Sequence, residues 1–152
     1  PGIAVDLAMG LGENSTFLIN CGWKVLGVDI SSVAIKKATR KSPEVLAIIA
    51  DLDTLLFTQN SVNLILNFYY LNRKIIPWFK NLIKPGGYVL LETLTIPMLE
   101  KKPEIPVEFL LRTGELRELF SDWNILDYRE GWYKSSSSNS KSIASIFAQD
   151  RF

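Results

Sequence analysis

Histidine is absent from this chain of 152 residues, and Cys21 is its single cysteine. Without histidine the chain cannot assemble a Ser-His-Asp or Cys-His nucleophilic centre, and a zinc site is disfavoured. One cysteine can form neither an intramolecular disulfide nor a multi-cysteine metal site. We therefore expect no bound metal, and a reducing, cytoplasmic setting is the default.

An excess of one charge is also lacking. Seventeen basic and sixteen acidic side chains give a net charge of +1, so the composition shows no electrostatic footprint for nucleic acid or an anionic membrane. No apolar run reaches the roughly 20 residues of a membrane-spanning helix, and no signal peptide is recognisable. We therefore expect a small-molecule substrate, with neither nucleic acid nor a membrane as partner. The sequence does not indicate an oligomeric state.

Apolar segments alternate with segments of helical spacing in the first part of the chain. The expected strands are residues 3–7, 24–28, 45–49, 62–66 and 88–91, and the expected helices are 14–21, 73–83 and one that follows the serines at 31–32. Short buried strands separated by helices predict a parallel sheet covered on both faces. In the first helix we expect Phe17, Leu18 and Cys21 to share the buried face, and Gly22 to end the helix.

The pattern changes after Glu92. Residues 93–112 contain three prolines and three glutamates without clean periodicity, which predicts a loop or lid. A helix at 114–121 and strands at 124–129 and 142–148 follow, and the serine run at 135–138 is expected at the tip of a hairpin. The sequence thus predicts an α/β fold, with a doubly wound, mostly parallel seven-stranded sheet and a C-terminal antiparallel hairpin.

The length of 152 residues is most simply one domain. Pro1 stands directly before the first expected strand, without an initiator methionine. We therefore expect that an N-terminal segment is missing from this sequence.

Residues 5–14 are the most informative segment. An apolar strand ends in Asp6, and a loop with Gly10 and Gly12 leads into a helix. Glycine has no Cβ, so a ligand can approach such a backbone closely. A carboxylate at the strand end would repel a pyrophosphate but suits a ligand whose nearby part is cationic. S-adenosylmethionine is such a ligand, because it carries an ammonium and a sulfonium.

The succession of motifs resembles the class I S-adenosylmethionine-dependent methyltransferases, with their Rossmann-like fold, over nearly the whole chain. The resemblance rests on DLAMGLG at 6–12, GVD at 27–29, ADL at 50–52 and KPGGY at 84–88. Ala8 stands where the usual loop pattern of that family has its first glycine. ENS at 13–15 and RTGEL at 112–116 are similar to the tellurite-resistance methyltransferase branch.

The resemblance implies a cofactor site at the carboxyl ends of the strands. Asp6 would lie near the methionine end of S-adenosylmethionine, and the loop glycines would let the backbone approach its carboxypropyl and ribose portions. Asp29 would accept hydrogen bonds from both ribose hydroxyls, and Asp51 with the backbone of Leu52 would contact the adenine. The expected cofactor-binding residues are Asp6, Ala8, Gly10, Gly12, Asn14, Asp29, Ile30, Asp51, Leu52, Asn67 and Phe68.

Each of these acids also has a purely structural interpretation. Asp29 can cap the helix that follows it, Asp51 can begin a turn before Asp53, and a Gly-Leu-Gly loop can simply turn a corner. The acids are informative together because Asp6, Asp29 and Asp51 end consecutive strands in register with the loop.

Methyl transfer from a sulfonium is an in-line displacement to which a protein contributes mainly proximity and alignment. Residues 67–70, NFYY, follow the fourth strand. Tyr69 and Tyr70 point to opposite faces if the strand continues, so at most one enters the site, and we expect Tyr70 to do so. Arg112 is the second candidate catalytic residue, because it can pair with an anionic substrate. The alternative for Arg112 is an ordinary surface arginine.

Two other classes of function stay open. An NAD-dependent oxidoreductase would also need a glycine loop and Asp29, but usually has no acid at the position of Asp6. A noncatalytic member could bind the cofactor weakly or serve as a partner for another protein. Met9 and Leu11 inside the loop, and Asn63 in the fourth strand, leave room for it. The attacking atom of the acceptor (oxygen, nitrogen, sulfur or a metalloid oxyanion) is not distinguished.

Overall fold

The computed structural model describes residues 1–134 and 139–151, and its strands form one seven-stranded sheet in the order β3-β2-β1-β4-β5-β7-β6. The strands are β1 (Ile3–Leu7), β2 (Lys24–Asp29), β3 (Leu46–Ile49), β4 (Val62–Phe68), β5 (Ile83–Leu94), β6 (Asn124–Lys134) and β7 (Ser140–Gln149). The serine run at 135–138, expected at a hairpin tip, lies outside the described residues.

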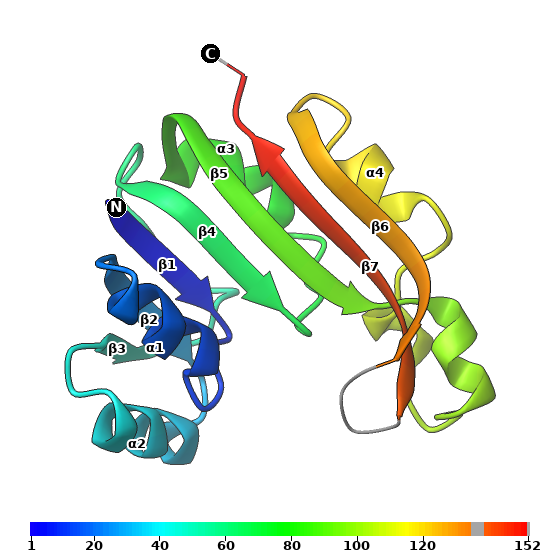
Figure 1. Ribbon diagram of the computed structural model, residues 1–152, viewed down its shortest axis with the longest axis horizontal. Helices are drawn as coiled ribbons and strands as arrows, with labels where there is room; N and C mark the ends of the chain where they lie inside the picture. The colour runs from blue at the N-terminus through cyan, green and yellow to red at the C-terminus, as the bar shows by residue number, and fades with distance from the viewer. Residues whose placement is uncertain (135–138, 152) are drawn as a thin grey trace.

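The first five strands are parallel to one another, whereas β7 runs antiparallel to both of its neighbours, β5 and β6. In Figure 1 the arrowheads of β1, β4 and β5 point the same way, and that of β7 points back. The predicted parallel sheet with a C-terminal antiparallel hairpin is therefore confirmed.

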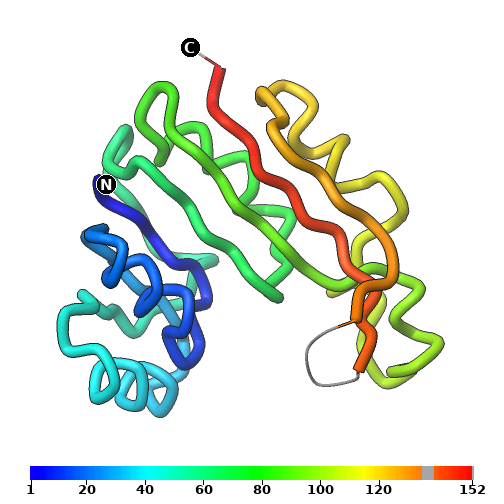
Figure 2. The backbone as a smooth tube through the Cα atoms, in the orientation of Figure 1, coloured from blue at the N-terminus to red at the C-terminus, as the bar shows by residue number. Residues whose placement is uncertain are grey.

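Helices cover both faces of the sheet. The α-helices are α1 (Glu13–Asn20), α2 (Ser32–Lys41), α3 (Phe79–Leu82) and α4 (Glu115–Leu119), and the 3-10 helices are η1 (Ile76–Trp78), η2 (Ile96–Glu100) and η3 (Val107–Phe109). Figures 1 and 2 show α1 and α2 on one face at the β1–β3 end, and α3 and α4 on the other face. This is the predicted doubly wound arrangement. Of the helices within the described residues, none has the length and apolar character that crossing a membrane requires.

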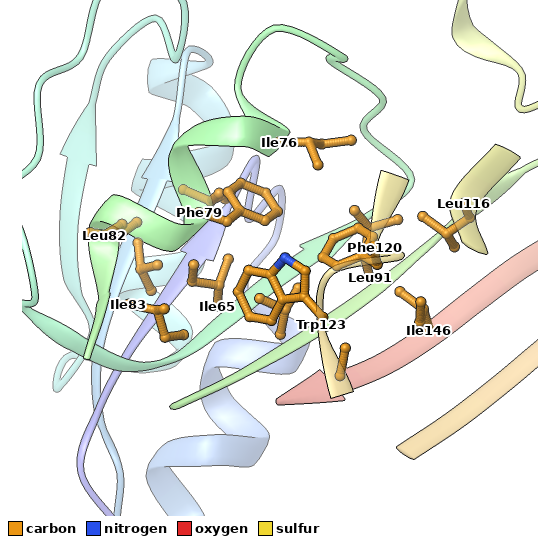
Figure 3. Close-up of a cluster of buried hydrophobic side chains, with 14 of the residues drawn as sticks. Ile65, Ile76, Phe79, Leu82, Ile83, Leu91, Leu116, Phe120, Trp123 and Ile146 are labelled. Carbon is orange, nitrogen blue, oxygen red and sulfur yellow. The ribbon is translucent and has the colours of Figure 1, made fainter. Parts of the chain in front are cut away.

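Side chains that alternate along the strands belong to two separate hydrophobic cores. On the α3 and α4 face, Ile65, Leu91 and Ile146 of the sheet pack against Phe79, Phe120 and Trp123, as Figure 3 shows. On the α1 face, Ala4, Leu64 and Leu66 pack around Leu18. Residues next to each other on a strand thus belong to opposite cores, as the two-residue period of a strand requires.

The predicted helix 73–83 is wrong. Only η1 and the four-residue α3 form within it, and Ile83 already belongs to β5, where it pairs with Val62. Pro77 lacks an N–H and disfavours a helical conformation at the residue before it, which explains the short, irregular helix. Residues 84–87 lie in a register shift inside β5, with Gly86 in the left-handed conformation at φ 75°.

The prediction for the buried face of α1 is also wrong in part. Leu18 is buried, but Phe17 is 67% exposed and Cys21, expected in the core, is exposed. The helix is only eight residues long and turns Ser15 and Leu18, three positions apart, toward the sheet. Gly22, at φ 86°, ends the helix as predicted.

Residues 93 and 94, expected in the loop or lid, are the last residues of β5, and residues 95–112 fold back onto the end of that strand. Leu111 forms a bridge with Thr95, its N–H donates to the carbonyl of Leu94 (3.0 Å), and Leu110 and Leu111 are buried. Phe109 stays exposed. The segment is therefore anchored at its ends, and its role as a lid stays a prediction.

Arg73 fastens this segment to the turn after β4. Its Nε lies 2.5 Å from Oε1 of the buried Glu115, and its Nη2 lies 3.0 Å from Oε2. Two further N–H groups donate to the carbonyls of Glu108 (2.6 Å) and Leu110 (2.9 Å). The hydrogen bond from Arg73 lowers the pKa of Glu115 to about 2. This ion pair therefore joins three separate parts of the chain.

Replacing Arg73 with methionine should destabilise the fold. The Arg73→Met variant leaves the buried Glu115 carboxylate without its main partner, so the free energy of unfolding should fall by about 2–3 kcal/mol. Arg129→Met is the matched control, because the Arg129–Asp127 pair (3.1 Å) is exposed on both sides, and it should cost less than about 1 kcal/mol. Urea denaturation of both variants measures this, and equal losses would contradict the assignment.

Candidate functional site

The three acids singled out in the sequence lie at one edge of the sheet. β1, β2 and β3 are parallel neighbours, so their carboxyl ends meet at the same edge. Asp6 pairs in register with Gly27, Asp29 pairs with Ile49, and the N–H of Ala50 donates to the carbonyl of Asp29 (3.0 Å). The structure therefore brings these side chains to the edge where open α/β sheets bind ligands.

The loop between β1 and α1 has a left-handed backbone at alternate positions. Ala8, Gly10 and Gly12 have φ of 55°, 56° and 73°. Ala8 holds a conformation that glycine adopts without cost and that costs an L-residue about 1–2 kcal/mol. A Cβ built on Gly10 would meet no atom within 4 Å, so the space above the loop is open to a ligand.

Met9 anchors the loop to β2. Its N–H donates to the carbonyl of Val28 (2.9 Å), and its side chain is buried against Ile35 and Val45. A Cβ on Gly27 would lie 2.0 Å from the sulfur of Met9, so any other residue there would displace the Met9 side chain. Met9, which the sequence leaves as a possible sign of a noncatalytic protein, is thus a packing residue.

Asp29 joins the loop to the start of α2. Its Oδ2 accepts the N–H of Gly10 (2.8 Å) and its Oδ1 accepts the N–H of Ser31 (2.8 Å). Ser31 in turn accepts the N–H of Ala34 and caps α2. A carboxylate oxygen can accept more than one hydrogen bond, so Asp29 has this structural role and can still accept hydrogen bonds from ligand hydroxyls.

Asp6 is almost completely buried beneath the loop. It is 2% exposed and accepts a hydrogen bond from the hydroxyl of Ser15 (2.7 Å). Burial raises the pKa of Asp6 to about 6, although the hydrogen bonds from Ser15 oppose the shift. The negative charge of Asp29 also disfavours the ionised form of Asp6, so a positively charged ligand group at this edge would stabilise it.

The remaining residues expected around the cofactor differ in exposure. Oδ1 of Asp51 accepts the N–H of Asp53 (2.9 Å). Asp51 therefore does begin the turn that is its structural interpretation in the sequence. Leu52 is buried in the core on the α3 and α4 face, and Asn14 is half-buried. Ile30, beside Asp29, is 69% exposed, which leaves an apolar side chain uncovered at this edge.

Asn67 is buried at the carboxyl end of β4, in register with Leu7. Within residues 1–134 and 139–151, neither its Oδ1 nor its Nδ2 has a hydrogen-bond partner. Buried amide groups nearly always form hydrogen bonds, so a bound ligand could supply the ones that the Asn67 amide is missing. The neighbouring Phe68 packs against the core on the α1 face.

The two candidate catalytic residues have different surroundings. Tyr70 packs against the main core, and its hydroxyl accepts a hydrogen bond from Asn72 (3.2 Å). The Arg112 side chain is 70% exposed, and its Nε lies 3.5 Å from Oε2 of Glu115. Among the described residues these two side chains share no hydrogen bond, and no group of acids and Cys21 could hold a metal ion.

Two features of the edge have no counterpart in the sequence analysis. Ser15 binds Asp6, which its position on α1 facing the strand end could have indicated. A pocket of about 270 Å³ lies between residues 52–59 and α3, with Leu7 and Leu52 in its lining. No local sequence pattern predicts that pocket, because its lining comes from three separate parts of the chain.

Comparison with known proteins adds to this geometry. Residues 1–147 match the family model described as tellurite resistance protein TehB. A probable S-adenosyl-L-methionine-dependent methyltransferase TehB of Haemophilus influenzae is 28% identical over 145 residues, covering 83% of this chain and 47% of that relative. The chain thus spans about half the length of the curated relatives it matches.

Solved structures share the fold. TehB from Haemophilus influenzae superimposes with a TM-score of 0.81 at 23% identity, covering 98% of this chain and 57% of that chain. An S-adenosylmethionine-dependent methyltransferase from Methanosarcina mazei gives a TM-score of 0.80 at 19% identity, covering 99% and 92%. The Rossmann-like methyltransferase fold expected from the sequence is therefore confirmed.

The buried Asp6 makes the stability of the protein depend on pH. Because its folded pKa is about 6 against 3.8 for the free side chain, the folded state holds this proton more tightly than the unfolded state. Its contribution to the free energy of unfolding should therefore fall as pH rises from 4 to 6, by on the order of 3 kcal/mol. Asp6→Asn, which cannot ionise, removes this slope.

Urea denaturation between pH 4 and 7.5 measures the effect. We expect Asp6→Asn to gain stability relative to the wild type as pH rises toward 6, and the difference to level off above it. A difference between the two proteins that does not change with pH would show that Asp6 is not desolvated in the fold.

Proposed function

We infer that this chain, which belongs to the tellurite resistance protein TehB family, binds S-adenosylmethionine at the carboxyl ends of β1, β2 and β4 and methylates a small-molecule acceptor. When bound, S-adenosylmethionine supplies a methyl group on a positively charged sulfur. The residues of this edge would bind and orient that group, and the acceptor would supply the attacking atom.

The side chains fit such a cofactor. Asp6 contributes a negative charge beneath the loop that suits a cationic ligand, and the space over Gly10 is open. The unsatisfied amide of Asn67 lies across from the loop, on the neighbouring strand. Ile30 offers exposed apolar surface beside Asp29, on which the flat face of an adenine ring could pack.

The fixed geometry of the Asp29 carboxylate is the observation that supports the proposal most strongly. Its two oxygens hold the N–H groups of Gly10 and Ser31, which fixes the carboxylate at the sheet edge and aims it across the loop. A carboxylate fixed in this way is suited to a pair of neighbouring hydroxyls, such as those of a ribose. The argument against a nicotinamide cofactor comes from Asp6 instead, because a carboxylate at the end of β1 would repel a pyrophosphate held by the loop.

The acceptor side of the proposal rests on the segment 93–112 and the turn after β4. We propose that the segment, held by Arg73 and Glu115, covers the acceptor, and that Arg112 and Tyr70 contact it. The protein need not supply a base when the attacking atom of the acceptor is held in line with the methyl group in a site without water. The small-molecule acceptor and the cytoplasmic setting stay predictions from composition.

Calorimetric titration of the full chain tests the proposed cofactor. S-adenosylmethionine and S-adenosylhomocysteine should bind, whereas NADH should not. In Asp29→Ala the affinity for both should fall by about 1–3 kcal/mol, because the ribose loses its acceptor. Asp127→Ala, on the exposed part of β6, is the matched control and should leave the affinity unchanged.

The outcomes separate the three functional classes. Tight binding of NADH would overturn the proposal in favour of an oxidoreductase. Binding of S-adenosylmethionine without release of S-adenosylhomocysteine, in the presence of an acceptor panel of thiols, phenols, amines and tellurite, would favour a noncatalytic protein. Unchanged affinity in Asp29→Ala would sink the role of Asp29.

A further inference from the structure

The connection from β3 to β4 lacks the helix that usually covers a parallel sheet at such a place. β2 and β1 lie between these two strands, and a crossover of this kind is usually an α-helix. Residues 50–61, all within the described part of the chain, contain no helix. Leu52, Leu55 and Phe57 of this connection pack against the core on the α3 and α4 face. That part of the face is therefore covered by a loop alone.

The pocket of about 270 Å³ lies between this loop and α3. Its lining includes Leu7, Phe79 and Leu82, which are at most 5% exposed, and Figure 3 shows the latter two within the core. Leu56 and Trp78 also line the pocket, although they are 85% and 61% exposed. Large apolar side chains left uncovered around an apolar hollow are typical of a binding site.

Two charged side chains line the pocket, and they differ in their partners. The carboxylate of Asp53 accepts a hydrogen bond from the side-chain amide of Asn72. Asn72 in turn accepts the backbone N–H of Lys74 (3.0 Å). Among the residues that the structure describes, no carboxylate forms a salt bridge with the ammonium of Lys74. Of the two charged groups, Lys74 is therefore the one available to a ligand.

The pocket is distinct from the proposed cofactor site. Of the residues expected to bind the cofactor, all of which the structure describes, only Leu52 lines the pocket. The N–H groups of Thr54 and Leu55 donate to the carbonyl of Asp51 (3.1 and 3.0 Å), and Leu55 lines the pocket. One turn therefore contributes Asp51 to the edge of the sheet and Leu55 to the pocket.

We propose that this pocket is a second binding site, which takes a small apolar molecule with one anionic group. The apolar body would pack between Leu55 and Trp78, and the anion would pair with the ammonium of Lys74. The volume of about 270 Å³ lies just below the usual range of ligand pockets, roughly 300–1,000 Å³, and favours a molecule about the size of naphthalene. The charge of Lys74 favours an acid over a neutral molecule of the same shape. This site does not depend on the proposed function.

The probes 2-naphthoate and 2-naphthamide test this, because they share one apolar body and differ in charge. In calorimetric titration of the full chain, 2-naphthoate should bind about tenfold more tightly than 2-naphthamide. Lys74→Met keeps an apolar side chain but removes the cation, so it should bind both probes about equally. Lys36→Met is the matched control, because it removes the same charge from an exposed position on α2, and it should keep the preference.

S-adenosylhomocysteine shows which site the probe occupies. In a chain saturated with it, 2-naphthoate should still bind. Trp78→Ala should weaken the binding of 2-naphthoate about tenfold and leave that of S-adenosylhomocysteine unchanged. Mutual exclusion of the two ligands would place the probe at the cofactor edge and overturn the inference.

Two further results would overturn it. One is an unchanged preference for 2-naphthoate in Lys74→Met. The other is a wild type that binds neither probe, which would favour a protein segment as the cover of the pocket. Failure of the wild type to bind S-adenosylhomocysteine would overturn the proposed function alone, because the Lys74 and Trp78 variants still test the pocket.

Discussion

The hydrogen bonds that Asp29 accepts from Gly10 and Ser31 are the constraint on which the rest of the site depends. The loop after β1 has a left-handed backbone at Ala8, Gly10 and Gly12, and the N–H of Gly10 needs an acceptor from outside the loop. Asp29 supplies that partner and at the same time fixes the beginning of α2. One carboxylate at the edge of the sheet therefore holds both the loop and the start of α2 in place.

The edge divides into two parts with different chemistry. The ends of β1, β2 and β3 carry carboxylates, a buried Asp6 among them, and suit a cationic ligand with hydroxyl groups. At the end of β4, the phenol of Tyr69 donates to Glu92 of β5, and the ammonium of Lys141 of β7 lies 4.4 Å from the centre of its ring. The Arg73–Glu115 pair then ties the segment 93–112 to the turn after β4, on the side where the acceptor is proposed to lie.

Much of the fold could be predicted because its signals are local. Short apolar runs, acids at strand ends and glycines in turns gave the strand positions and the covered parallel sheet, and the three acids do meet at one edge. The helix 73–83 was wrong because apolar spacing outweighed the effect of Pro77. The buried positions of Phe17 and Cys21 were wrong because a helix of eight residues contacts the sheet along only a narrow face.

The features that sequence reasoning missed are long-range. Tyr69 and Glu92 are 23 positions apart and Arg73 and Glu115 are 42 apart, so neither pair leaves a local pattern. The fit of Met9 over Gly27 depends on the packing of β1 against β2. The left-handed backbone of Tyr69 could not be predicted either, because tyrosine has no preference for that conformation.

Amide hydrogen exchange at Gly10 and Ser31 tests most directly whether Asp29 preforms the cofactor site. If it does, both N–H groups are protected in the free protein, and adding S-adenosylhomocysteine changes their protection little. Rapid exchange at both amides in the free protein, with protection only after S-adenosylhomocysteine is added, would show that the ligand itself builds the loop and would contradict this account.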